Sequence, residues 1–420
     1  MELLDKKVTV VGCGKSGQAA ARLSHKLKAT VKVSESKSLE SIPQDFQDWM
    51  SACAVAVEHD GHTQAFIEDS DLIVISPGVR PGAPVFLWAR QKGIPVWSEI
   101  ELAAHICPCP IIAVTGSNGK TTVVTLIQKV LEAAGRKAYL CGNIGRPFCV
   151  CVEELKKEDY VVVEVSSFQL ETIETFKPYI AVLLNFSQNH LDWHKDLDEY
   201  WTAKKRICLN QDKNDYAVLN VADERVKSLA SEIQARPVFF NNPGDCEKFC
   251  VGNPNFLAVM AVAQTFGIDK DVCRKVFDSF SGVEHRLEKV RVLDGVEFVN
   301  DSKSTTVEAG RWALNNTDKP VVMICGGRDK NVDFSVLAHA VKQNVKAMIV
   351  FGEARGKLKD VFAPVVDVDE CEGLEQAVFC ARQKAEAGDC VLLSPMCASF
   401  DQFKSFEERG EVFKDIVRCL

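Results

Sequence analysis

Residues 111–122 constrain the fold of this chain more than any other stretch, because they join an apolar strand pattern to a glycine turn, a lysine and two threonines. The stretch reads IIAVTGSNGKTT, and residues 123–131 continue with apolar side chains at helical spacing before a stop at Gly135. Backbone N–H groups of such a turn can wrap a phosphate, the lysine adds positive charge, and a helix N-terminus favours an anion. The stretch predicts a strand, a phosphate-binding loop and a helix in an α/β sheet, with ATP as the ligand.

The loop departs from the common pattern G-x-x-x-x-G-K-[ST], since Val114 stands in place of its first glycine. Lys120 and Thr121 keep their places, which provides a cation for the phosphates and a hydroxyl ligand for Mg²⁺. A strand-to-helix turn that needs glycine only for its backbone is the alternative, and the helical pattern after the loop favours nucleotide binding. The candidate ATP-binding residues are Gly116, Ser117, Asn118, Gly119, Lys120, Thr121 and Thr122.

Another glycine turn, GCGKSG at residues 12–17, follows an apolar strand pattern near the start of the chain. Its G-x-G-x-x-G spacing predicts a phosphate-bearing nucleotide at the following helix, and Glu35 stands where an acid often binds a ribose. The turn does not identify the base. An NAD cofactor is therefore the second interpretation, because the rest of the chain shows no obvious hydride-transfer residues.

Strand and helix patterns alternate along the whole chain, which predicts the α/β class. We expect three domains: a Rossmann-like doubly wound domain at residues 1–98, a central P-loop-type ATPase domain at 99–282, and a Rossmann-like C-terminal domain at 283–420. Besides the strand that starts near residue 111, strands are expected at residues 8–11, 30–33, 72–75, 95–97, 160–165, 180–184, 216–219, 290–292, 297–299, 321–325, 347–351 and 390–393.

Charge and apolar content exclude several classes of protein. The chain has 420 residues, 46% of them hydrophobic, a net charge of −8 and no block of Lys or Arg. This composition is typical of a globular protein with several cores and argues against general nucleic-acid binding. No uncharged apolar run approaches the length of a membrane span. We expect a cytoplasmic monomer whose partners are small molecules.

The 17 cysteines have irregular spacing, no C-x-x-C pair and an odd number, so they predict reduced thiols and not a disulfide framework. Reduced thiols agree with a cytoplasmic location. Cys107 and Cys109 flank a proline and are the nearest thing to a metal or redox pair. A zinc site is not expected there, because no second Cys or His pair lies close in the sequence.

Two further residues are placed for metal chemistry at the edge of the central sheet. Glu164 ends an apolar strand, and the carboxyl ends of parallel strands form the ligand-binding edge of an α/β sheet. It is a candidate Mg²⁺ ligand, with an acidic residue in a solvated loop as the alternative. His190 follows the next strand, and a purely structural histidine is equally compatible with its position.

Four runs in the central part of the chain resemble the Mur ligases, ATP-dependent ligases that build the stem peptide of peptidoglycan. They are TGSNGKTT at 115–122, EVSSFQLE at 164–171, NHLD at 189–192 and AKKRI at 203–207. The run SPMCASFDQFKSFEERG at 394–410, together with NDSKST at 300–305, resembles the family members that add D-glutamate. The resemblance covers essentially the whole chain.

The resemblance implies that ATP phosphorylates the L-alanine carboxylate of UDP-N-acetylmuramoyl-L-alanine, and that the amine of D-glutamate then attacks the acyl phosphate. A carboxylate is a poor acceptor until one of its oxygens belongs to a phosphate leaving group, and the charge of that step calls for metal and lysine. Another Mur-type or folylpolyglutamate-type amide ligase is the nearest alternative. A NAD-dependent oxidoreductase is a remote one.

The same resemblance implies the catalytic set. Lys120 would hold the ATP phosphates, while Thr121, Glu164, His190 and Lys204 would bind Mg²⁺, with two ions expected. Lys204 matches a family lysine that becomes carbamylated, which requires a neutral amine and turns a cation into an anion. A solvated helix lysine is the alternative for this position.

Substrate contacts are implied at both ends of the chain. The family pattern H-N-x-x-N reads PNFLA at 254–258, so Asn255 is kept as an adenine contact while two positions of the pattern are lost. Arg286 and Asp301 would reach ATP, or could form an ordinary surface salt bridge. The D-glutamate candidates are His285, Lys303, Thr305, Lys330, Ser399, Phe400 and Phe406, where helix core is the alternative for Phe406 and Arg328 departs from the family pattern. The UDP-sugar candidates are Lys15, Ser16, Glu35, Ser36 and Asn143.

Overall fold

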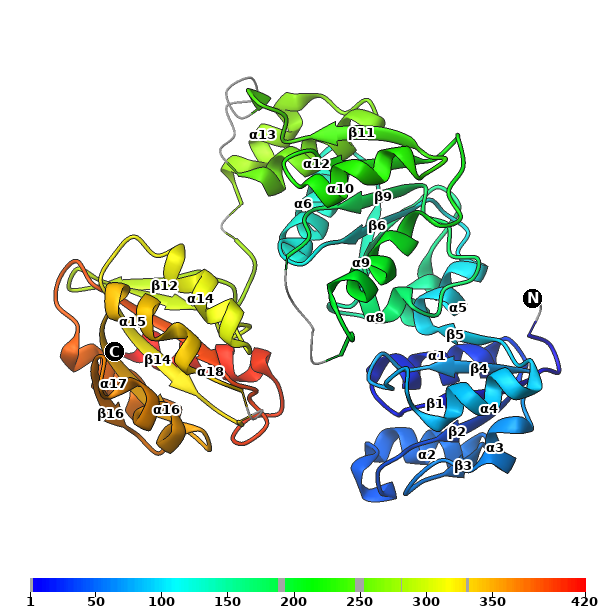
Figure 1. The fold of residues 1–420 in the computed structure, drawn as a ribbon, viewed down its shortest axis with the longest axis horizontal. Helices are drawn as coiled ribbons and strands as arrows, with labels where there is room; N and C mark the ends of the chain where they lie inside the picture. Colours follow the sequence, from blue (N-terminus) through cyan, green and yellow to red (C-terminus); the bar gives the residue numbers. More distant parts are fainter. Residues whose placement is uncertain (1–2, 188–192, 246–252, 281, 330–331) are drawn as a thin grey trace. The chain divides into compact units, whose positions relative to one another are not determined.

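The computed structural model describes residues 3–187, 193–245, 253–280, 282–329 and 332–420 (Figure 1). The chain forms two compact units, residues 1–280 and 281–420. The first unit contains two sheets and the second contains one.

The first sheet has five parallel strands in the order β3-β2-β1-β4-β5. Its central strand β1 is buried on both faces from Val8 to Val11, as expected for a parallel strand covered by helices. The strand order changes direction at β1, so the glycine turn at residues 12–17, the first along the chain, lies at the switch point where ligands bind such sheets. The elements are β1 (Lys7–Val11), α1 (Lys15–Lys26), β2 (Thr30–Ser34), η1 (Leu39–Ser41), α2 (Gln44–Ala52), β3 (Ala56–Glu58), α3 (Gln64–Glu68), β4 (Leu72–Ile75), α4 (Pro84–Lys92) and β5 (Val96–Ser98).

The second sheet has six parallel strands in the order β11-β10-β9-β6-β8-β7. Because β6 lies between β8 and β9, the loops after these three strands meet at one edge. The strands are β6 (Ile111–Thr115), β7 (Ala138–Gly142), β8 (Tyr160–Glu164), β9 (Ile180–Leu183), β10 (Tyr216–Asn220) and β11 (Arg236–Phe240). The helices are α5 (Glu99–Ile106), α6 (Lys120–Ala133), α7 (Phe148–Cys151), η2 (Val152–Glu154), α8 (Ser167–Leu170), α9 (Leu197–Lys205), η3 (Arg206–Cys208), α10 (Glu224–Ser228), η4 (Leu229–Ser231), α12 (Pro254–Thr265) and α13 (Lys270–Asp278).

The third sheet has the order β12-β13-β17-β14-β15-β16, and only β12 runs antiparallel to its neighbour. Asp294 and Gly295 have φ of 51° and 79° and join β12 to β13, a pair of residues that tolerates the left-handed backbone of a hairpin turn. The elements are β12 (Glu288–Leu293), β13 (Val296–Asn300), α14 (Val307–Asn315), β14 (Val321–Gly326), η5 (Ser335–Leu337), α15 (Ala338–Asn344), β15 (Val345–Phe351), α16 (Arg355–Phe362), β16 (Asp367–Glu370), α17 (Leu374–Lys384), β17 (Cys390–Met396) and α18 (Phe406–Cys419).

The predicted α/β class is confirmed, with one sheet in each of the three expected domains. The domain boundaries at 98/99 and 282/283 stay predictions. Four strands were missed, namely β3, β7, β11 and β16, and each lies at a sheet edge. An edge strand need not be apolar on both faces, and β16 reads only DVDE.

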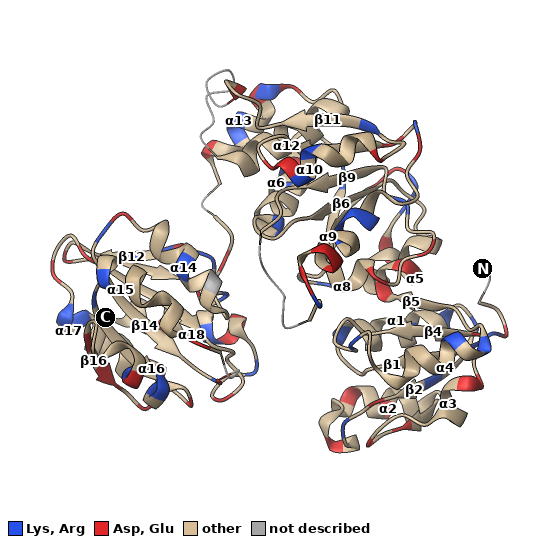
Figure 2. Cartoon of the chain, viewed as in Figure 1, with Lys and Arg blue, Asp and Glu red and all other residues tan. Residues whose placement is uncertain are grey.

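Surface charge and helix length bear on the possible partners. In Figure 2 the Lys and Arg positions along the ribbon are interspersed with Asp and Glu positions, so the binding of an anion depends on local donors. Within the described ranges, no helix is both long enough and apolar enough to span a membrane.

Candidate active site

The second glycine turn along the chain, residues 116–119, forms a tight loop between β6 and α6. Gly116 and Gly119 have φ of 156° and 83°, a backbone region that favours glycine. A Cβ on Gly119 would lie 2.4 Å from Oδ1 of Asn255, and one on Gly116 would lie 2.9 Å from Cβ of Leu184. Both glycines are therefore required by backbone conformation and by close neighbours, whichever ligand the loop holds.

The side chains of Lys120 and Asn185 hold the loop in shape. Lys120 Nζ donates to the carbonyl oxygens of Gly116 at 2.8 Å and Ser117 at 3.2 Å, so its ammonium group lies against the loop. The backbone N–H of Asn118 donates to Oδ1 of Asn185 at 2.9 Å. A cation and a turn of this kind together provide a cradle for a phosphate.

Two predicted residues bind the buried carboxylate of a third beside this loop. Glu164 is 3% exposed at the end of β8, and its Oε2 accepts a hydrogen bond from Oγ1 of Thr121 at 2.7 Å. Its Oε1 accepts from Nδ2 of Asn143 at 3.1 Å. The alternative of a solvated acidic loop residue is wrong for Glu164. Carboxylate and hydroxyl oxygens are the ligands that a hard cation such as Mg²⁺ prefers, so Thr121 and Glu164 fit that ion.

Lys204 lies in the last turn of α9 and is 2% exposed. Its Nζ donates to the carbonyl oxygen of Gly116 at 2.9 Å and lies 4.7 Å from the ring centroid of Tyr200. Burial lowers the pKa of Lys204 well below its ordinary value, and the charge of Lys120 lowers it further. The alternative of a solvated helix lysine is wrong for Lys204, whereas Lys205 is partly exposed and pairs with Glu232 at 3.0 Å.

His190 and Lys330 lie outside the described residues, so their predicted roles stay predictions. The sequence analysis did not single out His194, which contacts two residues of the EVSSFQLE run. His194 is 2% exposed, with Nε2 at 2.9 Å from Oγ of Ser167 and Nδ1 at 3.2 Å from Oε1 of Glu171. Burial raises the pKa of Glu171 to about 7. The one sequence signal for the contact between His194 and Glu171 was that Glu171 is the last residue of the EVSSFQLE run.

Glu171 also lines two cavities, and among the described residues none of the predicted site residues lines either of them. The larger has a volume of about 580 Å³. The smaller brings together Ser76, Gln169 and Glu171. Ser76 follows β4 and donates from Oγ to the carbonyl oxygen of Gly12 at 2.9 Å, so it lies beside the first glycine turn. The larger cavity is lined by Arg80, Pro81, Gly82, Ala83, Glu171, Trp193, Lys195 and Glu199.

The first glycine turn packs as closely as the second, but it contacts a carboxylate where the second contacts a lysine. A Cβ on Gly17 would lie 1.9 Å from the carbonyl oxygen of Gly12. Oε2 of Glu35 accepts from the backbone N–H of Cys13 at 2.6 Å, and Oε1 accepts from the N–H of Lys37 at 3.1 Å. Burial alone would raise the pKa of Glu35, but these backbone hydrogen bonds bring it below its ordinary value. Of the other candidates here, Lys15 and Ser36 are exposed and Ser16 is half-buried.

The predicted ATP contacts fall in both units. In the first, the side chain of Asn255 lies against Gly119 of the phosphate loop. In the second, Asp301 is 3% exposed and accepts from the N–H of Leu287 and from Oγ of Ser394, both at 3.2 Å. Burial raises the pKa of Asp301 to about 7. Because Asp301 is buried, it does not form an ordinary surface salt bridge with Arg286, although the charge of Arg286 lowers the pKa of Asp301.

Three of the predicted D-glutamate residues lie together in the second unit. The rings of His285 and Phe406 are 6.2 Å apart and almost perpendicular, and Nζ of Lys303 lies 5.7 Å from the Phe406 centroid. Phe406 begins α18 and is half-buried. Ser399 is buried, Thr305 is half-buried, and Phe400 is exposed.

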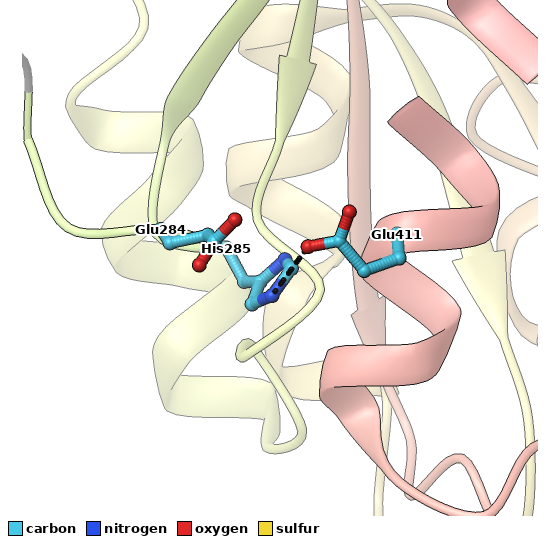
Figure 3. A group of neighbouring side chains, drawn as sticks. All are labelled: Glu284, His285 and Glu411. Atoms are coloured by element: carbon cyan, nitrogen blue, oxygen red, sulfur yellow. Dashed lines mark ion pairs between the residues drawn. The ribbon is translucent and has the colours of Figure 1, made fainter. Parts of the chain in front are cut away.

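An acidic cluster adjoins His285 but already contains a cation. Figure 3 shows the His285 ring between Glu284 and the α18 residue Glu411, with ligand atoms of the three within 4.8 Å of one another. Lys414, which is 4% exposed, bonds to Glu284 and lies 2.8 Å from Glu411. Burial alone would lower the pKa of Lys414, but hydrogen bonds to these carboxylates raise it above its ordinary value. The ammonium group compensates the acids, so we assign no metal to this cluster.

Comparison with known families gives a match in each of the three domains. Residues 6–98 match the Mur ligase MurD-like N-terminal domain, 114–249 the Mur ligase middle domain, and 285–397 the Mur ligase glutamate ligase domain. The UDP-N-acetylmuramoylalanine–D-glutamate ligase of Koribacter versatilis (strain Ellin345) is 39% identical over 449 residues, covering 100% of this chain and 99% of that protein. The enzyme of the same name from Pelotomaculum thermopropionicum is 38% identical, with 99% and 98% covered.

Solved structures are similar at the level of the fold. A UDP-N-acetylmuramate–alanine ligase from Thermotoga maritima has a TM-score of 0.59 at 17% identity, with 99% of each chain covered. A pseudomurein peptide ligase from Methanothermus fervidus has a TM-score of 0.56 at 18% identity, with 99% of this chain and 100% of that chain covered.

Proposed function

This chain belongs to the Mur ligase family, and from that premise we propose that it is the ATP-dependent ligase that adds D-glutamate to UDP-N-acetylmuramoyl-L-alanine. One observation supports the chemistry above all others. The amine of Lys204 is buried 2.9 Å from the carbonyl oxygen of Gly116 in the phosphate loop, and burial favours its neutral form. A neutral amine can take up CO₂, and the resulting carbamate would be an anion beside the phosphates.

The ligand roles at the central sheet follow from the chemistry of each donor. Lys120 and the loop N–H groups would hold the ATP phosphates, and Asn255 would contact adenine. Thr121, Glu164, His190 and carbamylated Lys204 would hold Mg²⁺, with two ions proposed. When bound, Mg²⁺ neutralises the charge that develops during phosphoryl transfer.

The reaction joins two molecules at the expense of one ATP. An oxygen of the L-alanine carboxylate attacks the γ-phosphorus, and the bond to ADP breaks. The D-glutamate amine then attacks the acyl carbon, and orthophosphate leaves with one of the former carboxylate oxygens. The proton lost by the amine must be taken up in this step, and the products are an amide, ADP and phosphate.

The remaining candidates bind the two substrates. Lys15, Ser16, Glu35, Ser36 and Asn143 would contact the UDP-sugar. In the second unit, Lys303 and Lys330 would pair with the carboxylates of D-glutamate, since a dianion needs charged donors. Arg286 and Asp301 would contact ATP, and His285, Thr305, Ser399, Phe400 and Phe406 would complete the amino-acid site.

We further propose that the enzyme acts as a monomer in the cytoplasm, on small-molecule substrates alone. The described cysteines form no disulfide, which agrees with a reducing compartment.

The test is phosphate release from ATP by the purified chain with UDP-N-acetylmuramoyl-L-alanine. D-glutamate should support turnover, while L-glutamate, glycine and meso-diaminopimelate should not. Turnover with meso-diaminopimelate instead, or only with a folate substrate and glutamate, would identify a different amide ligase of this superfamily.

Isotope labelling tests the proposed intermediate. With ¹⁸O in the L-alanine carboxylate, one labelled oxygen should appear in the orthophosphate. Its absence would contradict an acyl phosphate.

A further inference from the structure

Several cysteines of this chain lie close together, and none of them has a role in the proposed ligase reaction. Four of them, Cys107, Cys109, Cys141 and Cys151, lie close enough to influence one another's ionisation. They come from the connection between α5 and β6, from β7 and from α7. Among the described residues these thiols do not provide three ligand atoms within 4.8 Å of one another, so a metal site is not indicated.

Cys107 and Cys109 are the pair with a geometry suited to bonding. Their Sγ atoms are 3.8 Å apart. Cys107 caps α5 in an extended conformation, with φ of −65° and ψ of 121°, so alternate side chains of this segment project to the same side. Two residues of extended chain span at most about 7 Å, close to the Cα separation found in disulfides.

The two thiols differ in accessibility and acidity. Cys107 is half-buried, and its hydrogen bond with the Cys109 thiol lowers its pKa. Cys109 is 7% exposed, and its pKa is raised by the same contact and by burial. The half-buried member is thus the more accessible and the more acidic of the two thiols, and the thiolate is the form that reacts with oxidants.

We propose that Cys107 and Cys109 form a peroxide-sensitive thiol pair, which closes to an intrachain disulfide ahead of the other described cysteines. The Cys107 thiolate attacks a hydroperoxide, the O–O bond breaks, and a sulfenic acid and an alkoxide or hydroxide form. The sulfur of Cys109 then attacks the sulfenyl sulfur, the S–S bond forms, and water leaves with the thiol proton. Two electrons pass from the thiols to the peroxide.

A second pair in the chain provides a control for distance. The Sγ atoms of Cys371 and Cys380 are 3.5 Å apart, closer than those of Cys107 and Cys109. Burial raises the pKa of Cys371 to about 12. If proximity alone decided reactivity, the Cys371–Cys380 pair would close at least as fast.

Trypsin should release each pair in one peptide, residues 93–120 and residues 360–382, because neither range contains an internal Lys or Arg. The reduced full-length chain is treated with hydrogen peroxide, quenched with N-ethylmaleimide at intervals and analysed by mass spectrometry without reduction. Peptide 93–120 should lose two hydrogens and take up no label, about tenfold faster than peptide 360–382. Equal rates, faster closure of 360–382, or a link from Cys107 to Cys151 would each overturn the proposal.

Two variants separate the roles within the pair. In Cys109→Ser, Cys107 should stop at the sulfenic acid and react with dimedone. In Cys107→Ser, Cys109 should remain reduced at the same peroxide dose. Oxidation of Cys109 in Cys107→Ser at the wild-type rate would contradict the assignment of Cys107 as the attacking thiol. The wild-type peptide ratio tests the proposal even if a variant fails to fold.

Discussion

The two glycine turns of the first unit use the same backbone device in opposite electrostatic surroundings. Each follows a central parallel strand and precedes a helix, α1 in one case and α6 in the other. The first turn has the carboxylate of Glu35 on one of its N–H groups. The second has Lys120 on its carbonyl oxygens and the buried amine of Lys204 behind it. A glycine turn reports a backbone shape, and the charges around it decide how much negative charge it can accept.

Lys204→Ala should have the largest effect, and this effect should be confined to the second turn. We expect phosphate release to fall at least about 1000-fold, because the residue proposed to complete the metal site is lost. Affinity for the UDP-sugar at the first turn should change little. Steady-state kinetics measure the first effect and titration calorimetry the second.

Lys205→Ala is the matched control for this change. Lys205 is the next residue, is partly exposed and pairs with Glu232. Its removal should alter turnover by less than about twofold, since surface ion pairs contribute little. Ordinary activity in Lys204→Ala would refute the role of the buried amine.

Gly17→Ala should disrupt the first turn and leave the second intact. Alanine normally favours a helix, but here its Cβ would lie 1.9 Å from the Gly12 carbonyl oxygen. We expect a loss of about 3 kcal/mol in the free energy of unfolding, measured in urea, and weaker binding of the UDP-sugar. Gly14→Ala is the control, because a Cβ at that position would have no described atom within 4 Å. Equal effects of the two changes would show that close packing is not what requires glycine at 17.

Glu99→Gln should test whether a buried carboxylate makes the stability of the first unit depend on pH. Glu99 begins α5, which connects the first sheet to the second. Glu99 is fully buried, its Oε1 accepts from the N–H of Cys149 at 2.5 Å, and its Oε2 has no hydrogen-bond partner among the described residues. Burial raises the pKa of Glu99 from 4.5 to about 7, so between these values the folded state binds a proton that the unfolded chain has released. The free energy of unfolding should therefore fall as pH rises through this range, by about 2 kcal/mol and at most about 3.

Glutamine cannot titrate, so Glu99→Gln should remove that slope and be the more stable protein at pH 8. Glu101→Gln is the control. Glu101 accepts three hydrogen bonds, from Thr175 and Phe176, and losing the carboxylate should destabilise the chain at pH 8. Urea titrations at several pH values measure both. An unchanged slope in Glu99→Gln would locate the linkage elsewhere.

Glu35→Gln should have the smallest effect. Glutamine keeps one oxygen acceptor for the turn but loses the second, so we expect a cost of about 1 kcal/mol and a rise of about fivefold in KM for the UDP-sugar. Glu40→Gln, at an exposed position, should be neutral. Tighter binding in Glu35→Gln would mean that the carboxylate repels the diphosphate. Glu35 would then compete with the ligand for the N–H groups of the first turn.

Much of the fold could be predicted because its strong signals are local. The apolar strands and both glycine turns were located from pattern alone, while β16 was missed because an edge strand with the sequence DVDE carries no apolar alternation. The candidate site divides in the same way. Thr121 in the phosphate loop and Glu164 at a strand end were both expected to bind Mg²⁺, and Oγ1 of Thr121 lies 2.7 Å from Oε2 of Glu164. His194 was missed because its contact with Glu171 joins residues distant in the chain.

By itself, the sequence of this protein determined the α/β class, the family and the residue types at the phosphate loop, since these depend on periodicity and on short motifs. Only the tertiary structure decided that Lys204 is buried and Lys205 is not, that Glu35 turns its oxygens to the backbone, and that the Sγ atoms of Cys107 and Cys109 lie 3.8 Å apart. The physical reason is that pKa and reactivity depend on desolvation and on the nearest charges, and those are set by which segments pack together.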